Sequence, residues 1–360
     1  MSINAGFHPL KVAEVRRETP DAVSVRFDLP GHLRDTFAFT AGQHLTLRTR
    51  IGGEDVRRTY SLCVAPFEDE MRIAIKEMPG GKFSRWANRE IAPGQTIDVL
   101  PPMGRFLLPE DGASRAHYVA LAGGSGITPV ISIIKTALNK MAATSFTLLY
   151  GNRDSPSIMF LEELAQLKNR YMDRLEIYHF LENEAEEIEL FNGRLDRSKC
   201  EVVFSSLVDV AATKAFFICG PGPMMDAAES ALLARGVTPE RIFVERFSIG
   251  IVSAEQLARN EALEQKAAGA DLSIILDGRR SRVRFDAEKG SILESVQAAG
   301  LPAPYACKGG VCTTCRAKLI SGSVAMKKNY GLTEQETQQG YVLTCQAVPT
   351  SDAVTLSYDA

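Results

Sequence analysis

The sequence lacks most of the features that mark membrane, exported and nucleic-acid-binding proteins. It has no run of about eighteen apolar residues, and its first residues do not join a basic segment to an apolar one as an export signal does. The net charge is −3, so no basic surface for DNA or RNA is expected. The seven cysteines are an odd number, which argues against a disulfide framework. We therefore expect a cytoplasmic protein that binds neither membranes nor nucleic acid and keeps Cys63, Cys200 and Cys219 reduced.

The chain is long for a single core. With 360 residues, two or three domains are the natural expectation. Residues 1–112 contain short strand-like segments, for example Val23, Val25 and Phe27 alternating with polar residues. Many short strands at this spacing predict a small antiparallel barrel, with one helix expected over residues 81–89.

The rest of the chain changes its pattern twice. Residues 113–247 alternate strands with helices, one of them expected to begin at Pro156, and this pattern predicts a doubly wound parallel sheet. Residues 248–270 are rich in Ala, Glu and Gln without a strand pattern, which predicts a linker. Residues 271–360 contain two strands, a helix and a cysteine-rich loop, and predict a compact β-rich domain.

Four cysteines near the C-terminus have the spacing of metal ligands. Cys307, Cys312 and Cys315 form a C-x4-C-x2-C run, and Cys345 follows after a gap of 29 residues. This is the pattern of a plant-type [2Fe–2S] cluster, and the glycines at 309–310 would let backbone N–H groups approach its sulfurs. A structural zinc site is the alternative, although zinc sites usually contain two C-x2-C pairs and this sequence has one.

Two glycine turns follow strands of the α/β pattern. Gly124, Gly126 and Pro129 lie between a strand and a helix, and residues 219–223 form a second turn at the end of another strand. Glycines allow close approach of a ligand, and a helix N-terminus favours a pyrophosphate. Tight turns without a ligand are the alternative, but two such turns at the carboxyl ends of parallel strands favour dinucleotide binding.

The barrel contains a third candidate site. Arg58 can hold a phosphate bidentately, while Tyr60 and Ser61 can contact an aromatic ring system. The helix start at residues 81–84 could bind the rest of a pyrophosphate. A half-exposed surface strand is the alternative interpretation, and Trp86 is expected to pack rather than to stack on a ligand.

One position bears on the choice of coenzyme. Arg153 follows the second strand of the α/β pattern, where an acid would bind an unphosphorylated ribose and an arginine a 2′-phosphate. Arg153 thus favours NADPH, whereas Asp154 beside it keeps NADH open. A surface arginine without a ligand is the third possibility.

Taken in order, these motifs resemble the ferredoxin–NADP reductase superfamily joined to a C-terminal plant-type ferredoxin. More narrowly, residues 42–47, 304–312 and 340–347 are similar to the reductase subunits of phenylacetyl-CoA epoxidases, and the similarity extends over nearly the whole chain. The resemblance implies a flavin-binding β-barrel (1–112), an NAD(P)-binding α/β domain (113–247) and a β-grasp ferredoxin domain (271–360).

The resemblance also assigns roles to residues. It places Arg58 on the flavin phosphate, Cys219 near the nicotinamide, and Phe247 as the aromatic that covers the flavin. Glu245 is the one acid expected near the flavin, although a surface carboxylate is the simpler interpretation. The expected cluster ligands are Cys307, Cys312, Cys315 and Cys345, and the expected cofactor-binding set is Arg58, Tyr60, Ser61, Leu62, Lys76, Gly81, Lys82, Phe83, Ser84, Gly124, Gly126, Thr128, Pro129, Arg153, Cys219, Gly220, Pro221 and Phe247.

Electron counting orders these cofactors. Nicotinamide delivers two electrons as a hydride and the cluster accepts one, so a flavin must stand between them. The resemblance favours FAD over FMN and implies electron flow from NADPH through FAD and [2Fe–2S] to a di-iron oxygenase that epoxidises phenylacetyl-CoA. The alternatives are a reductase for a Rieske ring-hydroxylating or carnitine-type oxygenase or for a hybrid-cluster protein, and an electron carrier with a vestigial nucleotide site.

Overall fold

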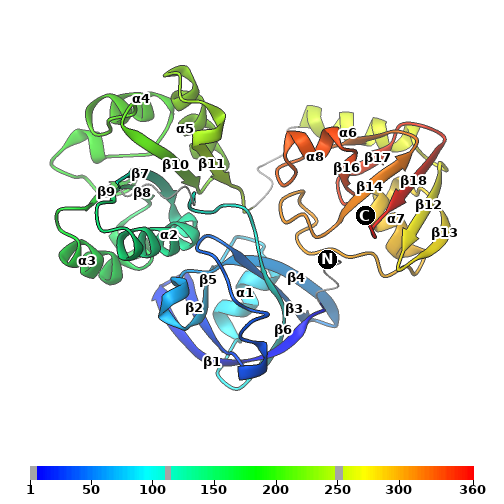
Figure 1. Ribbon diagram of the computed structural model, residues 1–360, viewed down its shortest axis with the longest axis horizontal. Coiled ribbons are helices and arrows are strands. Elements are labelled where there is room, and N and C mark those ends of the chain that lie inside the picture. The colour runs from blue at the N-terminus through cyan, green and yellow to red at the C-terminus, as the bar shows by residue number, and fades with distance from the viewer. Residues whose placement is uncertain (1–5, 110–114, 248–253) are drawn as a thin grey trace. The chain divides into compact units, whose positions relative to one another are not determined.

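The computed structural model describes residues 6–109, 115–247 and 254–360 (Figure 1). These residues divide into two compact units, one ending at Phe247 and one beginning after it. The first unit holds a β-barrel (6–109) and an α/β domain (115–247), and the second is called the C-terminal unit (254–360). The expected boundary at 112–113 and the start of the expected linker lie outside the described residues.

The barrel is a six-stranded antiparallel sheet, as expected, with strand order β4-β3-β6-β1-β2-β5. Alternating apolar residues such as Val23 and Val25 fill its interior, and helix α1 (Lys82–Arg89) covers one end. Trp86 packs edge-on against Phe83, which agrees with the packing role expected for it. The strands are β1 (His8–Thr19), β2 (Ala22–Asp28), β3 (His44–Ile51), β4 (Glu54–Ser61), β5 (Met71–Lys76) and β6 (Thr96–Met103).

The α/β domain contains a parallel five-stranded sheet with helices between its strands, as expected. Its strand order is β11-β10-β7-β8-β9, so the winding direction reverses between β7 and β10. Ligands of such sheets bind outside the carboxyl ends of the strands at this point. The elements are β7 (His117–Gly123), α2 (Ile127–Lys140), β8 (Ser145–Asn152), α3 (Leu161–Arg170), β9 (Leu175–Leu181), α4 (Arg197–Ser206), β10 (Thr213–Cys219), α5 (Gly222–Ala234) and β11 (Ile242–Glu245).

Helix α3 corrects one expectation. Pro156 lies in a short 3-10 turn (Ser155–Ser157) and does not begin the helix, which starts at Leu161. Phe160 precedes it with a left-handed φ of 59°, so the chain cannot continue helically from the proline turn. The apolar spacing located the helix, but the proline belongs to a separate turn.

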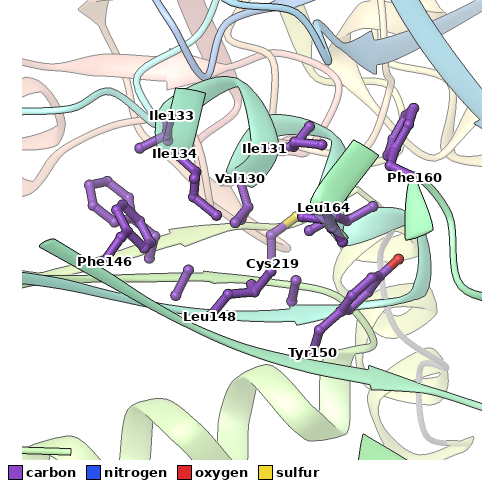
Figure 2. Close-up of a cluster of buried hydrophobic side chains, with 14 of the residues drawn as sticks. Val130, Ile131, Ile133, Ile134, Phe146, Leu148, Tyr150, Phe160, Leu164 and Cys219 are labelled. Atoms are coloured by element: carbon purple, nitrogen blue, oxygen red, sulfur yellow. The ribbon is translucent and has the colours of Figure 1, made fainter. Parts of the chain in front are cut away.

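Helix α2 is buried on almost every side. All residues from Ile127 to Leu138 are buried, because the helix lies between the parallel sheet and the barrel. In Figure 2, Val130 and Ile134 of α2 point toward the sheet, whereas Ile133 lies on the other side of the helix, where its Cδ1 would be 3.2 Å from a Cβ at Gly42 of the barrel. On the barrel side, Ser132 donates a 2.6 Å hydrogen bond to the carbonyl of Val64.

A buried lysine strengthens this contact between the two domains. The Lys135 ammonium lies 3.1 Å from Oε2 of Glu68 in the barrel and also contacts Glu163 of α3. Burial alone would lower the pKa of Lys135, but Glu163 and Glu68 hold it above the ordinary value. The lysine therefore stays charged and connects three segments of the first unit.

The C-terminal unit has a mixed β-grasp sheet with order β13-β12-β18-β14-β16, in which β12 and β18 run parallel. Helix α7 packs on one face and contributes Leu293 and Val296 to the core. None of the helices in the three described segments has the length and apolar character needed to cross a bilayer. The elements are α6 (Ala254–Lys266), β12 (Asp271–Leu276), β13 (Arg279–Arg284), α7 (Ile292–Ala298), β14 (Arg316–Ser321), β15 (Val324–Met326), α8 (Glu334–Gln338), β16 (Tyr341–Leu343), β17 (Ala347–Pro349) and β18 (Ala353–Ser357).

Helix α6 corrects the expected linker. Residues 254–266 form a helix that packs on the C-terminal unit through Leu263, and Ala267 just beyond it is buried in the core. Glu264 pairs with Lys327 at 2.6 Å, with both side chains largely buried. The Ala- and Glu-rich composition that suggested a linker is equally that of a good helix former.

Candidate cofactor sites

The end of β4 and the start of α1 form the first candidate site. β4 pairs with β3 so that Ser61 lies opposite His44. Tyr60 packs against Phe83 of α1, with the ring centroids 5.5 Å apart. Burial raises the pKa of Tyr60, so its hydroxyl stays protonated at neutral pH. The contact between these rings joins the two segments that the sequence predicts to form one site.

Helix α1 begins in a way that suits an anion. No side chain caps its N-terminus, so its first N–H groups can bind a phosphate. A Cβ atom at Gly81 would lie 2.3 Å from Oγ of Ser84, so the turn requires glycine there. Lys82 pairs with Glu54 at 2.6 Å, which ties the helix start to β4. Arg58 is exposed and shares a strand face with Tyr60, since residues two apart on a strand point the same way.

Glu245 is not a surface carboxylate, which corrects the simpler interpretation of it. Only 8% of the residue is exposed, because the end of β11 packs against the end of β4. Its Oε2 accepts a 3.1 Å hydrogen bond from Ser61, and its Oε1 lies 3.7 Å from Nδ1 of His44. The acid expected near the flavin thus contacts a residue of the expected flavin set.

The glycine turns after β7 and β10 pack directly on each other. A Cβ atom at Gly126 would lie 2.0 Å from the carbonyl oxygen of Cys219, and one at Gly220 would lie 2.9 Å from the backbone nitrogen of Gly123. These two glycines are therefore required by the contact between the turns, whether or not a ligand binds. The turns lie where the sheet reverses its winding, which is where ligands of such sheets bind.

Other residues of these turns leave room for a ligand. Gly222 has no atom within 4 Å of the position of a Cβ, and Gly124 adopts a left-handed φ of 52°. No side chain caps α5, so its first N–H groups can bind phosphate oxygens, whereas α2 continues from the 3-10 turn Gly124–Gly126 and the N–H of Ile127 already donates to the carbonyls of Gly124 and Ser125. Tyr150 at the end of β8 donates a 2.9 Å hydrogen bond to the carbonyl of Gly124 and holds this turn in place. We call this region, including Arg153, the coenzyme edge.

Lys76, one of the expected cofactor-binding residues, lies at the coenzyme edge. Its ammonium would be 3.8 Å from a Cβ at Gly124. Arg153 follows β8 and pairs with Asp21 of the barrel at 2.8 Å. Asp154 caps the next turn by accepting the N–H of Ser157 at 3.0 Å.

Cys219 and Phe247 differ in exposure. The Cys219 thiol is fully buried and lies among side chains of α2 and α3 in Figure 2, near Val130 and Leu164. Burial raises the pKa of this thiol, with a further contribution from Glu245. The thiol therefore belongs to the core, while the carbonyl of Cys219 lies at the coenzyme edge. Phe247 follows β11 and is 41% exposed.

The four predicted cluster cysteines come together as two pairs. The backbone nitrogens of Cys307 and Cys312 each lie 3.4 Å from the other residue's Sγ, and Thr344, which precedes Cys345, donates a 2.9 Å hydrogen bond from its hydroxyl to the carbonyl of Cys315. Among the described residues, no group of three or more His, Cys, Asp or Glu side chains converges on a single metal position. Two pairs of thiolates suit two irons bridged by sulfide.

Backbone and side-chain donors surround the sulfurs. The N–H groups of Gly309 and Cys312 donate to Sγ of Cys307 at 3.3 and 3.4 Å, and the Thr314 hydroxyl donates to Sγ of Cys312 at 3.3 Å. The Cys312 thiol and backbone N–H groups lower the pKa of Cys307 to about 5. N–H and hydroxyl donors that point at the sulfurs fit the ligand set of an iron–sulfur cluster, whose sulfurs accept such hydrogen bonds. The glycines at 309–310 were expected to direct backbone N–H groups at the sulfurs, and the N–H of Gly309 does so.

Sequence reasoning missed several residues that support these sites. His44 lies beside Glu245, and its Nε2 is buried without a hydrogen-bond partner in the described structure. Tyr150 holds a glycine turn, and Gln346 donates to the carbonyl of Lys308 at 2.9 Å. His44 and Gln346 lie in the segments 42–47 and 340–347 that carry the family resemblance, whereas Tyr150 had no sequence cue.

Comparison with known protein families agrees with this architecture. Residues 9–107 match the family described as an oxidoreductase FAD-binding domain, and residues 120–230 match the oxidoreductase NAD-binding domain. Residues 274–350 match the 2Fe-2S iron-sulfur cluster binding domain. These three domains in one chain define a ferredoxin reductase-type NAD(P)H oxidoreductase with an iron–sulfur domain of its own.

Full-length relatives narrow the assignment. The chain is 40% identical to one component of the 1,2-phenylacetyl-CoA epoxidase of Escherichia coli, over 98% of each chain. It is 35% identical to the ferredoxin reductase component of 3-ketosteroid-9-alpha-monooxygenase from Rhodococcus rhodochrous, over 97% of this chain and 96% of that one. Phthalate dioxygenase reductase has the same fold, with a TM-score of 0.61 at 22% identity over 98% of each chain. The chain belongs to the family of flavin iron–sulfur reductases that includes this component of phenylacetyl-CoA epoxidase.

Proposed function

We propose that the chain carries electrons from NADPH through FAD and the [2Fe–2S] cluster to a di-iron oxygenase that epoxidises phenylacetyl-CoA in phenylacetate catabolism. The observation that supports it most strongly is the pairing of Cys307 with Cys312 and of Cys315 with Cys345. Bound FAD would accept a hydride from the nicotinamide and release its electrons one at a time to the cluster.

The residues have distinct roles in this proposal. Residues 1–112 bind FAD, with Arg58 and the start of α1 on its phosphates and Tyr60 and Ser61 on its ring system. Residues 113–247 bind the coenzyme at the glycine turns, and residues 271–360 hold the cluster. The hydrogen bond from Ser61 to Glu245 supports a ring site where the barrel meets the α/β domain.

The side chains after β8 support NADPH as the coenzyme. Arg153 can pair with a 2′-phosphate, whereas Asp154 already accepts a hydrogen bond from its own turn. A carboxylate engaged as a cap is a poorer acceptor for the hydroxyls of an unphosphorylated ribose. Lys76 adds a second cation at this edge.

The acceptor is assigned by similarity. The proposal of a cytoplasmic phenylacetyl-CoA-epoxidising partner rests on the 40% identity to an epoxidase component over nearly the whole chain. A steroid monooxygenase partner is the second candidate, supported by 35% identity over the same extent.

Replacing Cys345 with serine tests the order of the electron path. The variant should lose at least about nine-tenths of its electron delivery to a one-electron protein acceptor such as cytochrome c, because one iron loses a ligand. NADPH oxidation with ferricyanide, which the flavin can reduce directly, should continue. Cys200→Ser is the matched control, since Cys200 is a buried cysteine of the first unit.

Two outcomes would overturn parts of the proposal. Equal loss of both activities with flavin still bound would contradict the order of the path. The acceptor is tested separately, by mixing the reductase with purified di-iron epoxidase or with a steroid oxygenase. NADPH consumption that depends on phenylacetyl-CoA in the first mixture supports the proposed partner, and turnover in the second mixture alone contradicts it.

A further inference from the structure

An acid of the barrel reaches the coenzyme edge of the α/β domain. Asp21 lies in the turn between β1 and β2, and its Oδ2 is 2.8 Å from Nη2 of Arg153 and 3.8 Å from the ammonium of Lys76. The Thr19 hydroxyl donates to its other carboxylate oxygen at 2.8 Å, and its backbone carbonyl accepts the N–H of Glu77 at 2.7 Å. Asp21 is thus fixed by its own domain and presented to a cation of the other.

The two cations that Asp21 contacts flank the place proposed for the coenzyme. Lys76 lies beside the Gly124 turn, which receives phosphates, and Arg153 follows β8, where the ribose of an adenosine would lie. Asp21 therefore adds a negative charge between the two positive charges that would attract a 2′-phosphate.

We propose that Asp21 is a specificity-determining residue, whose carboxylate competes with the 2′-phosphate of NADPH for Arg153 and Lys76. The inference rests on the proposed function of this edge as the coenzyme site. A 2′-phosphate must displace Asp21 from Arg153 and then remain near a like charge, whereas NADH meets neither cost. Asp21 thereby narrows the preference for NADPH over NADH and leaves both coenzymes usable.

The test uses the full-length protein with its cofactors bound and two nucleotides that differ only in the 2′-phosphate, 2′,5′-ADP and 5′-AMP. In isothermal titration calorimetry, Asp21→Asn should bind 2′,5′-ADP about fivefold more tightly, the scale of a partly exposed ion pair. Binding of 5′-AMP should not change. The ratio of kcat/KM for NADPH to that for NADH should rise by a similar factor.

Three further variants separate the explanations. In an Arg153→Gln background, Asp21→Asn should have a much smaller effect, because its main partner is gone. Asp28→Asn is the matched control, since it removes an exposed acid elsewhere on the barrel. Lys76→Gln should weaken 2′,5′-ADP binding less than Arg153→Gln does, because Lys76 lies farther from Asp21 and beside the other turn.

Each remaining result overturns the inference in a recognisable way. Unchanged or weaker binding of 2′,5′-ADP to Asp21→Asn would mean that Asp21 does not compete with the phosphate. If Asp28→Asn bound 2′,5′-ADP more tightly by the same factor, the effect of Asp21→Asn would be explained by the net charge of the protein alone. If Arg153→Gln binds 2′,5′-ADP as tightly as the unaltered protein, the coenzyme site itself is misplaced, and the proposed function fails at this edge for a separate reason.

Discussion

The cluster loop and the coenzyme edge both bring together residues that are far apart in the chain, but they do so by different means. In the C-terminal unit, the four candidate cluster ligands are all cysteines, and their residue type alone indicates the chemistry expected there. At the coenzyme edge, backbone turns after β7 and β10 form the site, and the charges beside them come partly from the barrel. A thiolate site can therefore be inferred from spacing, whereas a phosphate site of this kind depends on contacts between domains.

The largest effect expected from this difference comes from a single methyl group. Gly126→Ala would place a Cβ 2.0 Å from the carbonyl oxygen of Cys219, so the two turns must separate. We expect kcat/KM for NADPH, measured with ferricyanide, to fall about a hundredfold, as small misplacements at reacting centres can cause. The absorbance of the cluster should be unchanged.

Gly31→Ala is the control for this change. It places a methyl group in the same unit, on the barrel and away from the glycine turns, with no atom within 4 Å, so the rate should change by less than about twofold. Comparable losses in the two variants would show that the loss does not come from the contact between the turns.

A smaller effect, on stability, is expected at Lys135. Replacing this lysine with methionine leaves Glu68 and Glu163 facing each other without their shared cation. Because both glutamates are 31% exposed, water screens the charges left behind, and we expect a loss of about 1–2 kcal/mol. Denaturant unfolding followed by flavin fluorescence should register that loss, while the transition followed by cluster absorbance should not move.

The same variant has a built-in check. Adding Glu68→Gln and Glu163→Gln to Lys135→Met should restore part of the stability, because no uncompensated charge remains. If Lys135→Met shifted both the flavin-fluorescence transition and the cluster-absorbance transition, the two units would not unfold independently. The division of the chain into two units would then be wrong.

The smallest expected effect is the change of stability with pH, which should also differ between the two units. Burial lowers the pKa of His117 and His179 from the ordinary value of 6.5. At pH values between 6.5 and these lowered pKa values, the unfolded chain therefore binds more protons than the folded chain does. Stability of the first unit should therefore be complete above pH 6.5 and decrease as the pH falls through the folded pKa values. Residues 254–360 contain no histidine and should lack this slope.

Unfolding midpoints recorded with the same two probes, on either side of the ordinary histidine pKa, check this expectation. His117→Gln and His179→Gln should each flatten the slope of the first unit. An equal slope in the C-terminal unit would point to carboxylates as its source.

Much of the fold could be predicted from the sequence. The barrel, the parallel sheet and a compact β-rich C-terminal domain followed from apolar periodicity and turn residues, and the family resemblance identified the last of them as a β-grasp ferredoxin domain. The iron–sulfur domain was predictable because cysteine is rare and the spacing of the four candidate ligands is the one that a cluster requires. Pro156 misled the placement of α3 because a proline can begin a 3-10 turn as readily as a helix.

The missed features share a physical cause. The burial of Glu245 and the pairing of Asp21 with Arg153 arise where the barrel packs on the α/β domain. No local pattern records which carboxylate will face which cation across such a contact. Helix α6 was missed for another reason, since Ala- and Glu-rich segments suit both linkers and helices until something packs against them.

Helix α2 has a consequence for how such proteins can be recombined. Because it is covered by its own sheet and by the barrel, neither of those two domains can be exchanged without exposing the isoleucines between them. The C-terminal unit has its own core and carries α6 with it. Chimeric proteins in which residues 254–360 are exchanged as a whole should therefore fold. Chimeras that combine the barrel of one protein with the parallel sheet of another should not.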